Sequence, residues 1–146
     1  MTLLNAPEYD PARERRRKLR IAILIAAAII VAMFLYLYRY WPQEHVVNKF
    51  FNDLEQQNYK QAYGVWMADP TWEQHPQKFN RYPFNEFYTD WGPGGEWGIV
   101  HNHRVEGAVR PKGGNGVVVV VEVNGRAEPA RLWVEGSDKS LSFSPF

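Results

Sequence analysis

The stretch IAILIAAAIIVAMFLYLY, residues 21–38, holds eighteen residues without a charge, a glycine or a proline. As a helix it would rise about 27 Å, which is close to the thickness of the hydrocarbon layer of a bilayer. It shows no polar face at any helical period, so it does not suit the surface of a soluble domain. We therefore expect one transmembrane helix, at residues 19–41, with the lipid bilayer as its partner.

The charges beside this stretch predict its orientation. Six basic side chains precede it within residues 13–20, whereas Arg39 follows it. Lysine and arginine flanking a membrane helix favour the cytoplasmic side. We therefore expect residues 1–18 to form a basic cytoplasmic tail and residues 42–146 to form a domain across the membrane.

A cleaved signal peptide is the alternative, because it also has a basic start. Its apolar region is shorter, about 7–15 residues, and a cleavage site with small residues follows it. Here the alanines at 26–28 lie in the middle of the apolar stretch, and its exit is bulky, with Tyr36, Tyr38, Tyr40 and Trp41. We expect an uncleaved signal anchor. The chain would then be a bitopic protein of the cell (inner) membrane with a periplasmic or otherwise extracytoplasmic domain.

Composition excludes some classes of site. The chain has 146 residues and no cysteine, so it has no disulfide and no cysteine-bound zinc. Its net charge of +1 is uneven: residues 1–41 carry seven basic and three acidic side chains, and residues 42–146 carry ten and thirteen. The expected domain is mildly acidic, which argues against nucleic acid as a partner. No phosphate loop or other cofactor motif appears, and no cofactor is expected.

The first half of the expected domain has the apolar spacing of helices. This spacing predicts helices over residues 43–57, 59–67 and 85–91. Asp69-Pro70 indicates the start of a short additional helix, because aspartate caps helices and proline suits their first position. Asn85 could cap the last of the three.

From Trp97 onward the apolar period changes from 3.6 residues to two, which is typical of strands. Four strands are expected, over residues 97–106, 117–123, 126–135 and 140–146. The second is nearly all valine, as in a strand covered on both faces. Helices followed by strands predict an α+β domain, with two to three helices packed on a curved four-stranded antiparallel sheet.

One turn can be predicted in detail. Asn124-Gly125 is a strong hairpin signal, because these residues tolerate the positive φ that both central positions of a type I′ turn require. A turn at this place would set Val121 opposite Glu128 in the neighbouring strand.

Two segments carry a family resemblance. Residues 46–54, VVNKFFNDL, and residues 57–63, QNYKQAY, resemble the opening of NTF2-like domains. These are cystatin-like α+β cones, in which a curved sheet wraps around helices and leaves a pocket. The expected strands agree in number and kind over most of residues 43–146. The resemblance extends to small single-span bacterial membrane proteins, and it implies a non-catalytic domain of a membrane assembly, an isomerase or a dehydratase.

Two histidines are candidates for a polar spot in such a pocket. A strand period would place His101 and His103 on one face with Trp97, where imidazoles could orient a ligand or exchange protons. The alternative is that the other face of this strand packs in the core, or that the pair lies near a rim. If the pair is interior, Asp90 or Tyr63 is the expected hydrogen-bond partner. A metal site would need a third ligand, and none is expected.

Aromatic side chains complete the candidate pocket, although aromatics at helical spacing also suit an ordinary core. The candidates are Tyr63, Trp66, Trp91, Trp97, His101 and His103. The carboxylates available for catalysis are Asp69, Asp90 and Glu96, which resemble helix caps and loop residues. We therefore expect a membrane-anchored binding or interaction module, with other envelope proteins as partners. The alternatives are a binder of a small apolar ligand and an isomerase- or dehydratase-like enzyme that uses the cone pocket.

Overall fold

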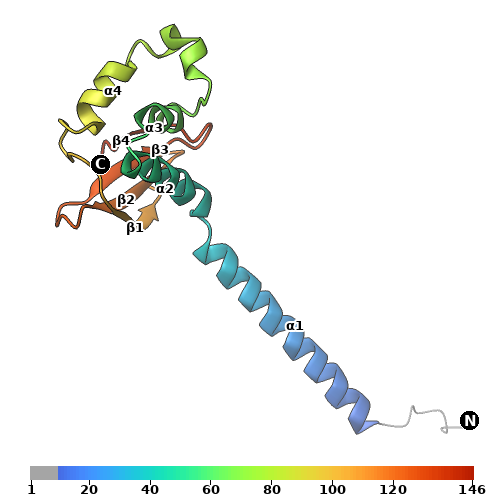
Figure 1. The fold of residues 1–146 in the computed structure, drawn as a ribbon. Helices are drawn as coiled ribbons and strands as arrows, with labels where there is room; N and C mark the ends of the chain where they lie inside the picture. Colours follow the sequence, from blue (N-terminus) through green and yellow to red (C-terminus); the bar gives the residue numbers. More distant parts are fainter. Residues whose placement is uncertain (1–9) are drawn as a thin grey trace, which may run out of the picture. The chain divides into compact units, whose positions relative to one another are not determined.

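The structure is a computed structural model that describes residues 10–146. The chain has an α+β fold in which helices come first and strands follow (Figure 1). The elements are α1 (Pro11–Leu37), α2 (Trp41–Glu55), α3 (Tyr59–Trp66), the 3-10 helices η1 (Trp72–Gln74) and η2 (Pro76–Phe79), α4 (Phe84–Trp91), β1 (His103–Val109), β2 (Val117–Val123), β3 (Ala130–Val134) and β4 (Leu141–Phe143). The chain divides after Arg39 into two compact units. Half of the expected cytoplasmic tail, residues 1–9, lies outside the described residues.

α1 begins at a complete N-cap. The Asp10 carboxylate accepts hydrogen bonds from the backbone N–H groups of Ala12 and Arg13, at 2.9 and 3.3 Å. Pro11 occupies the first turn, where its missing N–H costs nothing. None of the residues of α1 is buried. Within residues 10–146, this is the helix that is long and apolar enough to cross a membrane.

The expected helices of the domain are confirmed, with shifted boundaries. α2 begins and ends two residues earlier than expected, and α3 ends one residue earlier. Pro42 stands in the first turn of α2, which it helps to start. The segment after Asp69 forms η1 and η2 instead of an α-helix.

The proposed cap of α4 is wrong. Pro83, not Asn85, is the N-cap residue, and its extended backbone precedes the first helical residue, Phe84. The Pro83 carbonyl accepts hydrogen bonds from the N–H groups of Glu86 and Phe87, at 3.0 and 3.1 Å. Asn85 therefore lies inside the first turn of the helix and does not occupy the capping position.

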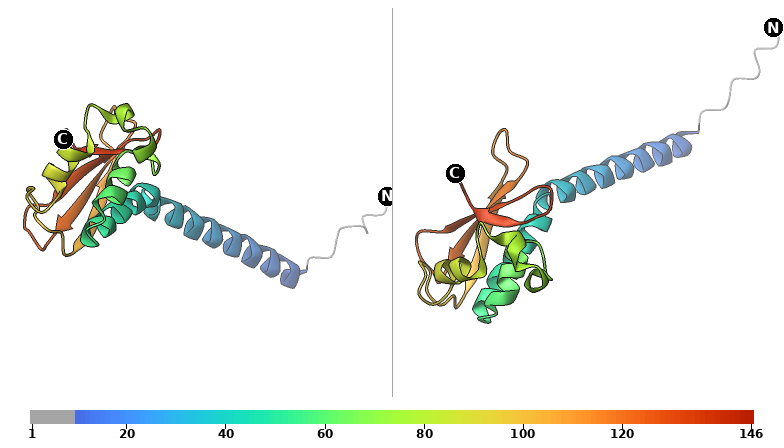
Figure 2. Two further views of the ribbon diagram at one scale, coloured as in Figure 1. Left: turned by 45° about the horizontal axis from the view of Figure 1, so that its top comes forward. Right: turned by 90° about the horizontal axis from the view of Figure 1, so that it is seen from above.

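The four strands form one antiparallel sheet in the order β1-β2-β3-β4, a meander, which confirms the expected four-stranded antiparallel sheet (Figure 2). β1 carries an irregularity in register between Val105 and Gly107. The strands β3 and β4 are shorter than expected. β4 and β1 are the two edges of the sheet.

The first strand begins at His103, and not at Trp97 as expected. The side chain of Asn124 takes the place of a strand partner for the preceding residues. Its amide donates to the carbonyls of Trp97 and Ile99, at 3.2 and 3.0 Å, and its oxygen accepts the His101 N–H at 2.7 Å. These bonds satisfy the backbone in a loop, so no ladder is needed there.

The turn between β2 and β3 has the expected conformation. Asn124 and Gly125 have φ of 53° and 66°, and the Arg126 N–H donates to the Val123 carbonyl at 3.0 Å. Both features are those of a type I′ hairpin turn.

The register beyond that turn differs from the expectation. Val121 lies opposite Ala130, and not opposite Glu128. The returning chain is therefore two residues longer before β3 begins than a regular two-residue hairpin requires. Pro129 is one reason, because proline has no N–H to donate to a neighbouring strand.

The core of the domain lies between the helices and one face of the sheet (Figure 2). Alternate valines of β2 are fully buried on this face, and Val118 on the other face is also buried, as the nearly continuous valine run predicts. Six aromatic residues of the helices fill the space above the sheet: Phe50, Phe51, Tyr63, Trp66, Phe87 and Trp91. The Phe50 ring lies 5.3 Å from that of Trp66 and 5.0 Å from that of Trp91. The interior of the domain is therefore filled by side chains at these residues.

Candidate functional site

Three of the expected pocket residues lie in the core. Tyr63, Trp66 and Trp91 are buried, and the two indole rings lie 5.5 Å apart. The Tyr63 ring packs against Phe87 at 5.2 Å, and its hydroxyl donates to the Tyr82 carbonyl at 2.7 Å. A ligand-binding role for these residues stays a prediction, and their packing explains how they stabilise the fold.

The two histidines have different environments. His101 is exposed and precedes β1, so it does not share a strand face with His103. The His103 ring stacks on Phe51 at 5.3 Å. Its Nδ1 lies 2.5 Å from Oε1 of Glu55, and its Nε2 lies 3.0 Å from Oδ1 of Asn48. His103 thus ties the start of the sheet to α2.

The hydrogen-bond partners expected for the histidines are wrong. Asp90 accepts a hydrogen bond from the Tyr82 hydroxyl at 2.8 Å, and Tyr63 bonds to the backbone of the same residue. Burial raises the pKa of Tyr82 far above its usual value, with a further contribution from the bond to Asp90. Trp97, the remaining candidate, is buried and belongs to the loop that precedes β1.

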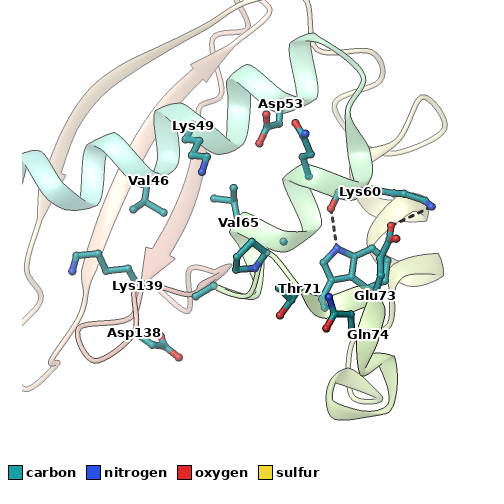
Figure 3. A pocket seen from close by; sticks show the side chains of 15 residues that line it. Val46, Lys49, Asp53, Lys60, Val65, Thr71, Glu73, Gln74, Asp138 and Lys139 are labelled. Atoms are coloured by element: carbon teal, nitrogen blue, oxygen red, sulfur yellow. Dashed lines mark hydrogen bonds and ion pairs between the residues drawn. The ribbon is translucent and has the colours of Figure 1, made fainter.

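A crevice of about 770 Å³ opens between α2 and α3 (Figure 3). α2 contributes Val46, Lys49 and Asp53, whose spacing of three and four residues places them on one side of the helix. Residues 70–74 and the turn at residues 138–139 complete the walls. The crevice is therefore built by segments from both ends of the domain sequence.

Asp53 is the unusual group in this crevice. Its Oδ2 is buried and has no hydrogen-bond partner within residues 10–146. Burial raises the pKa of Asp53, and the nearby charge of Lys49 opposes the rise. A buried carboxylate oxygen without a partner is unfavourable, so this group can gain from a cation or a hydrogen-bond donor on a ligand.

One wall of the crevice is fixed to α3 by a tryptophan. The Trp72 indole N–H donates to the Lys60 carbonyl at 3.0 Å, and the Lys60 ammonium pairs with Glu73 at 3.2 Å (Figure 3). A Cβ on Gly64 would lie 3.3 Å from the Asp69 carbonyl oxygen, which is a tight contact, so the absence of a side chain lets the start of this wall pack closely against α3.

Asp69 also stabilises the wall formed by residues 70–74, through hydrogen bonds within this segment and to the residue that follows it. Its carboxylate accepts bonds from the Thr71 N–H and hydroxyl, at 3.0 and 2.9 Å, and meets the His75 ring at 2.6 Å. The hydrogen bond with His75, followed by those with Thr71, holds the pKa of Asp69 well below its usual range. Asp69 is thus a loop-forming residue, as its position beside a proline indicates.

Comparison with protein-family models, with curated proteins and with solved structures finds no match for this chain. Within residues 10–146, no group of three or more histidine, aspartate or glutamate side chains is arranged to hold a metal ion. The geometry of the crevice is therefore the basis for a functional proposal.

Sequence patterns do not identify Asp53 as a site residue. The spacing of Lys49 and Asp53 shows that both lie on one face, but the second wall comes from residues 60–74 and from a turn 85 residues further along. The pair formed by Glu55 and His103 is likewise invisible at the level of sequence, because 48 residues separate its members.

Proposed function

We propose that the protein is a bitopic membrane protein with a cytoplasmic N-terminus, and that its domain, residues 42–146, is an extracytoplasmic binding module. The length and apolar surface of α1 support the membrane span. The basic residues that precede the span support the orientation. An NTF2-like architecture is part of this proposal, and the order of helices before a four-stranded meander supports it.

The observation that carries the binding function is that Asp53 lines an open crevice while its Oδ2 has no hydrogen-bond partner among residues 10–146. A ligand with an ammonium group or a polar N–H would supply the missing partner. The aromatic residues that an interior ligand would contact are packed against one another. This packing favours recognition at the domain surface over the two alternatives, a small apolar ligand in the cone and an enzyme.

Single cysteines test the location and the occupancy of the crevice, because the chain has none of its own. Gln61 is exposed and lines the crevice, whereas Gln77 is exposed in η2 and does not. A membrane-impermeant maleimide should label Gln77→Cys in cells whose inner membrane is intact. Gln61→Cys should react as fast as Gln77→Cys in the purified full-length protein, but several-fold more slowly in cells, where an occupant covers it.

A second substitution connects the protection to the carboxylate. Asp53→Asn should abolish the protection of Gln61→Cys in cells, whereas Glu86→Gln on α4, a matched change at an exposed carboxylate, should preserve it. If the labelling rate of Gln61→Cys relative to that of Gln77→Cys is the same in cells and in purified protein, the crevice is not occupied and the proposal is refuted. Labelling of Gln77→Cys only after membrane lysis would refute the extracytoplasmic location.

A further inference from the structure

Alternate backbone groups at the β4 edge of the sheet have no partner strand within residues 10–146. Backbone groups of Ser140 and Ser144 bond to the β3 segment, at 2.9 and 3.2 Å. Residues of an antiparallel strand alternate between bonding to one neighbour and facing the other side. Ser142 therefore also bonds toward β3, and the N–H and C=O groups of Leu141 and Phe143 point to the free edge.

A groove of about 460 Å³ runs along this edge. β4 forms one wall, residues 78–82 form the other, and Trp66 and Met67 line it from α3 and its end. The Phe143 side chain is 51% exposed, although its ring contacts Trp66 at 5.1 Å. An apolar side chain of a partner would cover this ring and gain contact area in the groove.

The charges of the groove have one sign. Lys78 and Arg81 are its charged lining residues, and both are cationic. Lys78 pairs with Asp69 at 3.5 Å, whereas Arg81 is exposed and has no ion-pair partner within residues 10–146. Among protein side chains, a carboxylate is the group that matches a guanidinium, through two parallel hydrogen bonds.

We propose that the β4 edge binds an extended segment of a partner protein as a fifth strand. The segment would bond to the free backbone groups of Leu141 and Phe143, pack an apolar side chain in the groove and place an acidic side chain against Arg81. Such addition of a strand obtains affinity from the backbone and specificity from alternate side chains. The groove shares no lining residue with the crevice of Asp53, so this inference is independent of the proposed function.

Two features favour a peptide of another protein as the occupant. The row of backbone donors and acceptors beside the groove matches an extended backbone. A second copy of this chain, paired through the same edge, would bring its own Lys78 and Arg81 toward these cations, and like charges across an interface are unfavourable.

Selection of peptides tests the proposal. Phage-displayed random octapeptides are selected on full-length protein in lipid nanodiscs, in the wild type, in Arg81→Glu and in Arg110→Glu. Arg110 is an exposed arginine that follows β1, at the other edge of the sheet, and it provides the matched charge change. Wild type and Arg110→Glu should enrich peptides with an acidic residue next to an aliphatic or aromatic one, and Arg81→Glu should bind these peptides at least ten-fold more weakly.

Synthetic versions of the enriched peptides test the backbone contacts. Two N-methylated forms of each peptide are compared, one methylated at the odd-numbered residues and one at the even-numbered residues. One form should lose binding and the other should keep it, because only one of the two sets of N–H groups faces the sheet edge. Circular dichroism and urea midpoints should show that Arg81→Glu remains folded. The proposal is overturned by a lack of enrichment on the wild type, by equal binding to Arg81→Glu, by binding of both N-methylated forms, or by a dimer of the wild type that Arg81→Glu abolishes.

Discussion

The Asp53 carboxylate places a buried oxygen in the crevice without a hydrogen-bond partner among residues 10–146. Burial raises its pKa in the folded protein above the value of about 3.9 in an unfolded chain. The ionised group therefore costs stability at neutral pH, and this cost disappears as the pH falls below the unfolded pKa. Asp53→Asn should raise the urea midpoint at pH 7 and change it little at about pH 3. Tryptophan fluorescence measures both midpoints, and a lower midpoint at pH 7 would contradict the argument.

Asp69 has the opposite linkage. The hydrogen bond with His75 lowers its pKa in the folded protein, so its contribution to stability is complete above the unfolded pKa of about 3.9. This contribution declines below that value and is lost only as the pH falls through the lower folded pKa. Asp69→Asn should therefore lower the urea midpoint at pH 7, and it should still lower it, by a smaller amount, at about pH 3, because that pH lies above the folded pKa. At pH 7 the two aspartate variants should shift the urea midpoint in opposite directions. A shift in the same direction would contradict the environment described for one of the two aspartates.

Individual contacts between distant residues are what sequence patterns fail to predict. The alternation of residues 97–106 correctly indicates extended backbone near His103, but it does not reveal that Glu55 and Asn48 bind this ring. It also cannot show that the Asn124 side chain replaces a strand partner for the residues around His101. Both contacts depend on how α2 and the β2–β3 turn pack, and such packing is decided only in the folded chain.

The end of α3 is an element held in an unfavourable backbone conformation. Ala68 has φ of 53°, and it lies between the Asp69 N–H to Gly64 carbonyl bond of 2.8 Å and the last turn of the helix. This is the position where glycine normally ends a helix, because a left-handed conformation costs other residues about 1–2 kcal/mol. Ala68→Gly should raise the free energy of unfolding by about 0.5–1 kcal/mol, since glycine also loses more entropy on folding. Ala68→Val should lower it, and urea unfolding distinguishes the two.

The β2–β3 turn permits a cleaner test of backbone strain. Gly125 has φ of 66°, and a Cβ at this position would meet no atom within 4 Å. Gly125→Val should therefore destabilise the domain through the backbone alone, by at least about 1 kcal/mol. Gly107→Val in β1 is the control, because it also meets open space but has no positive φ. Equal thermal midpoints for the two variants would remove the strain argument.

Secondary structure and strand order were predictable because they depend on local periodicity and turn residues. The valines of β2 and the Asn124-Gly125 turn specify a hairpin without reference to the rest of the chain. The register beyond the turn was not predictable, because residues 126–129 leave the ladder. The crevice was not predictable either, because four separate segments form it.

At the scale of the whole molecule, the division after Arg39 separates two kinds of surface. α1 has no buried residue and exposes its aliphatic side chains, which a bilayer would cover. The second unit buries aromatic residues of its helices in a core and presents a charged crevice and an apolar groove. This division supports the proposal that the first unit anchors the chain and the second recognises partners.

The proposed orientation depends on six basic residues: Arg13, Arg15, Arg16, Arg17, Lys18 and Arg20. A reporter that is active only outside the cytoplasm, fused after Phe146, should be active on the wild type. Replacing the six residues by glutamine should reduce this activity several-fold and activate a cytoplasm-only reporter at the same place, because flanking lysine and arginine set the orientation. Glutamine at Arg110, Lys112 and Arg126, far from the span, should change neither reporter. Activity of the cytoplasm-only reporter on the wild type would reverse the proposed orientation, and release of a shortened soluble form would identify the span as a cleaved signal.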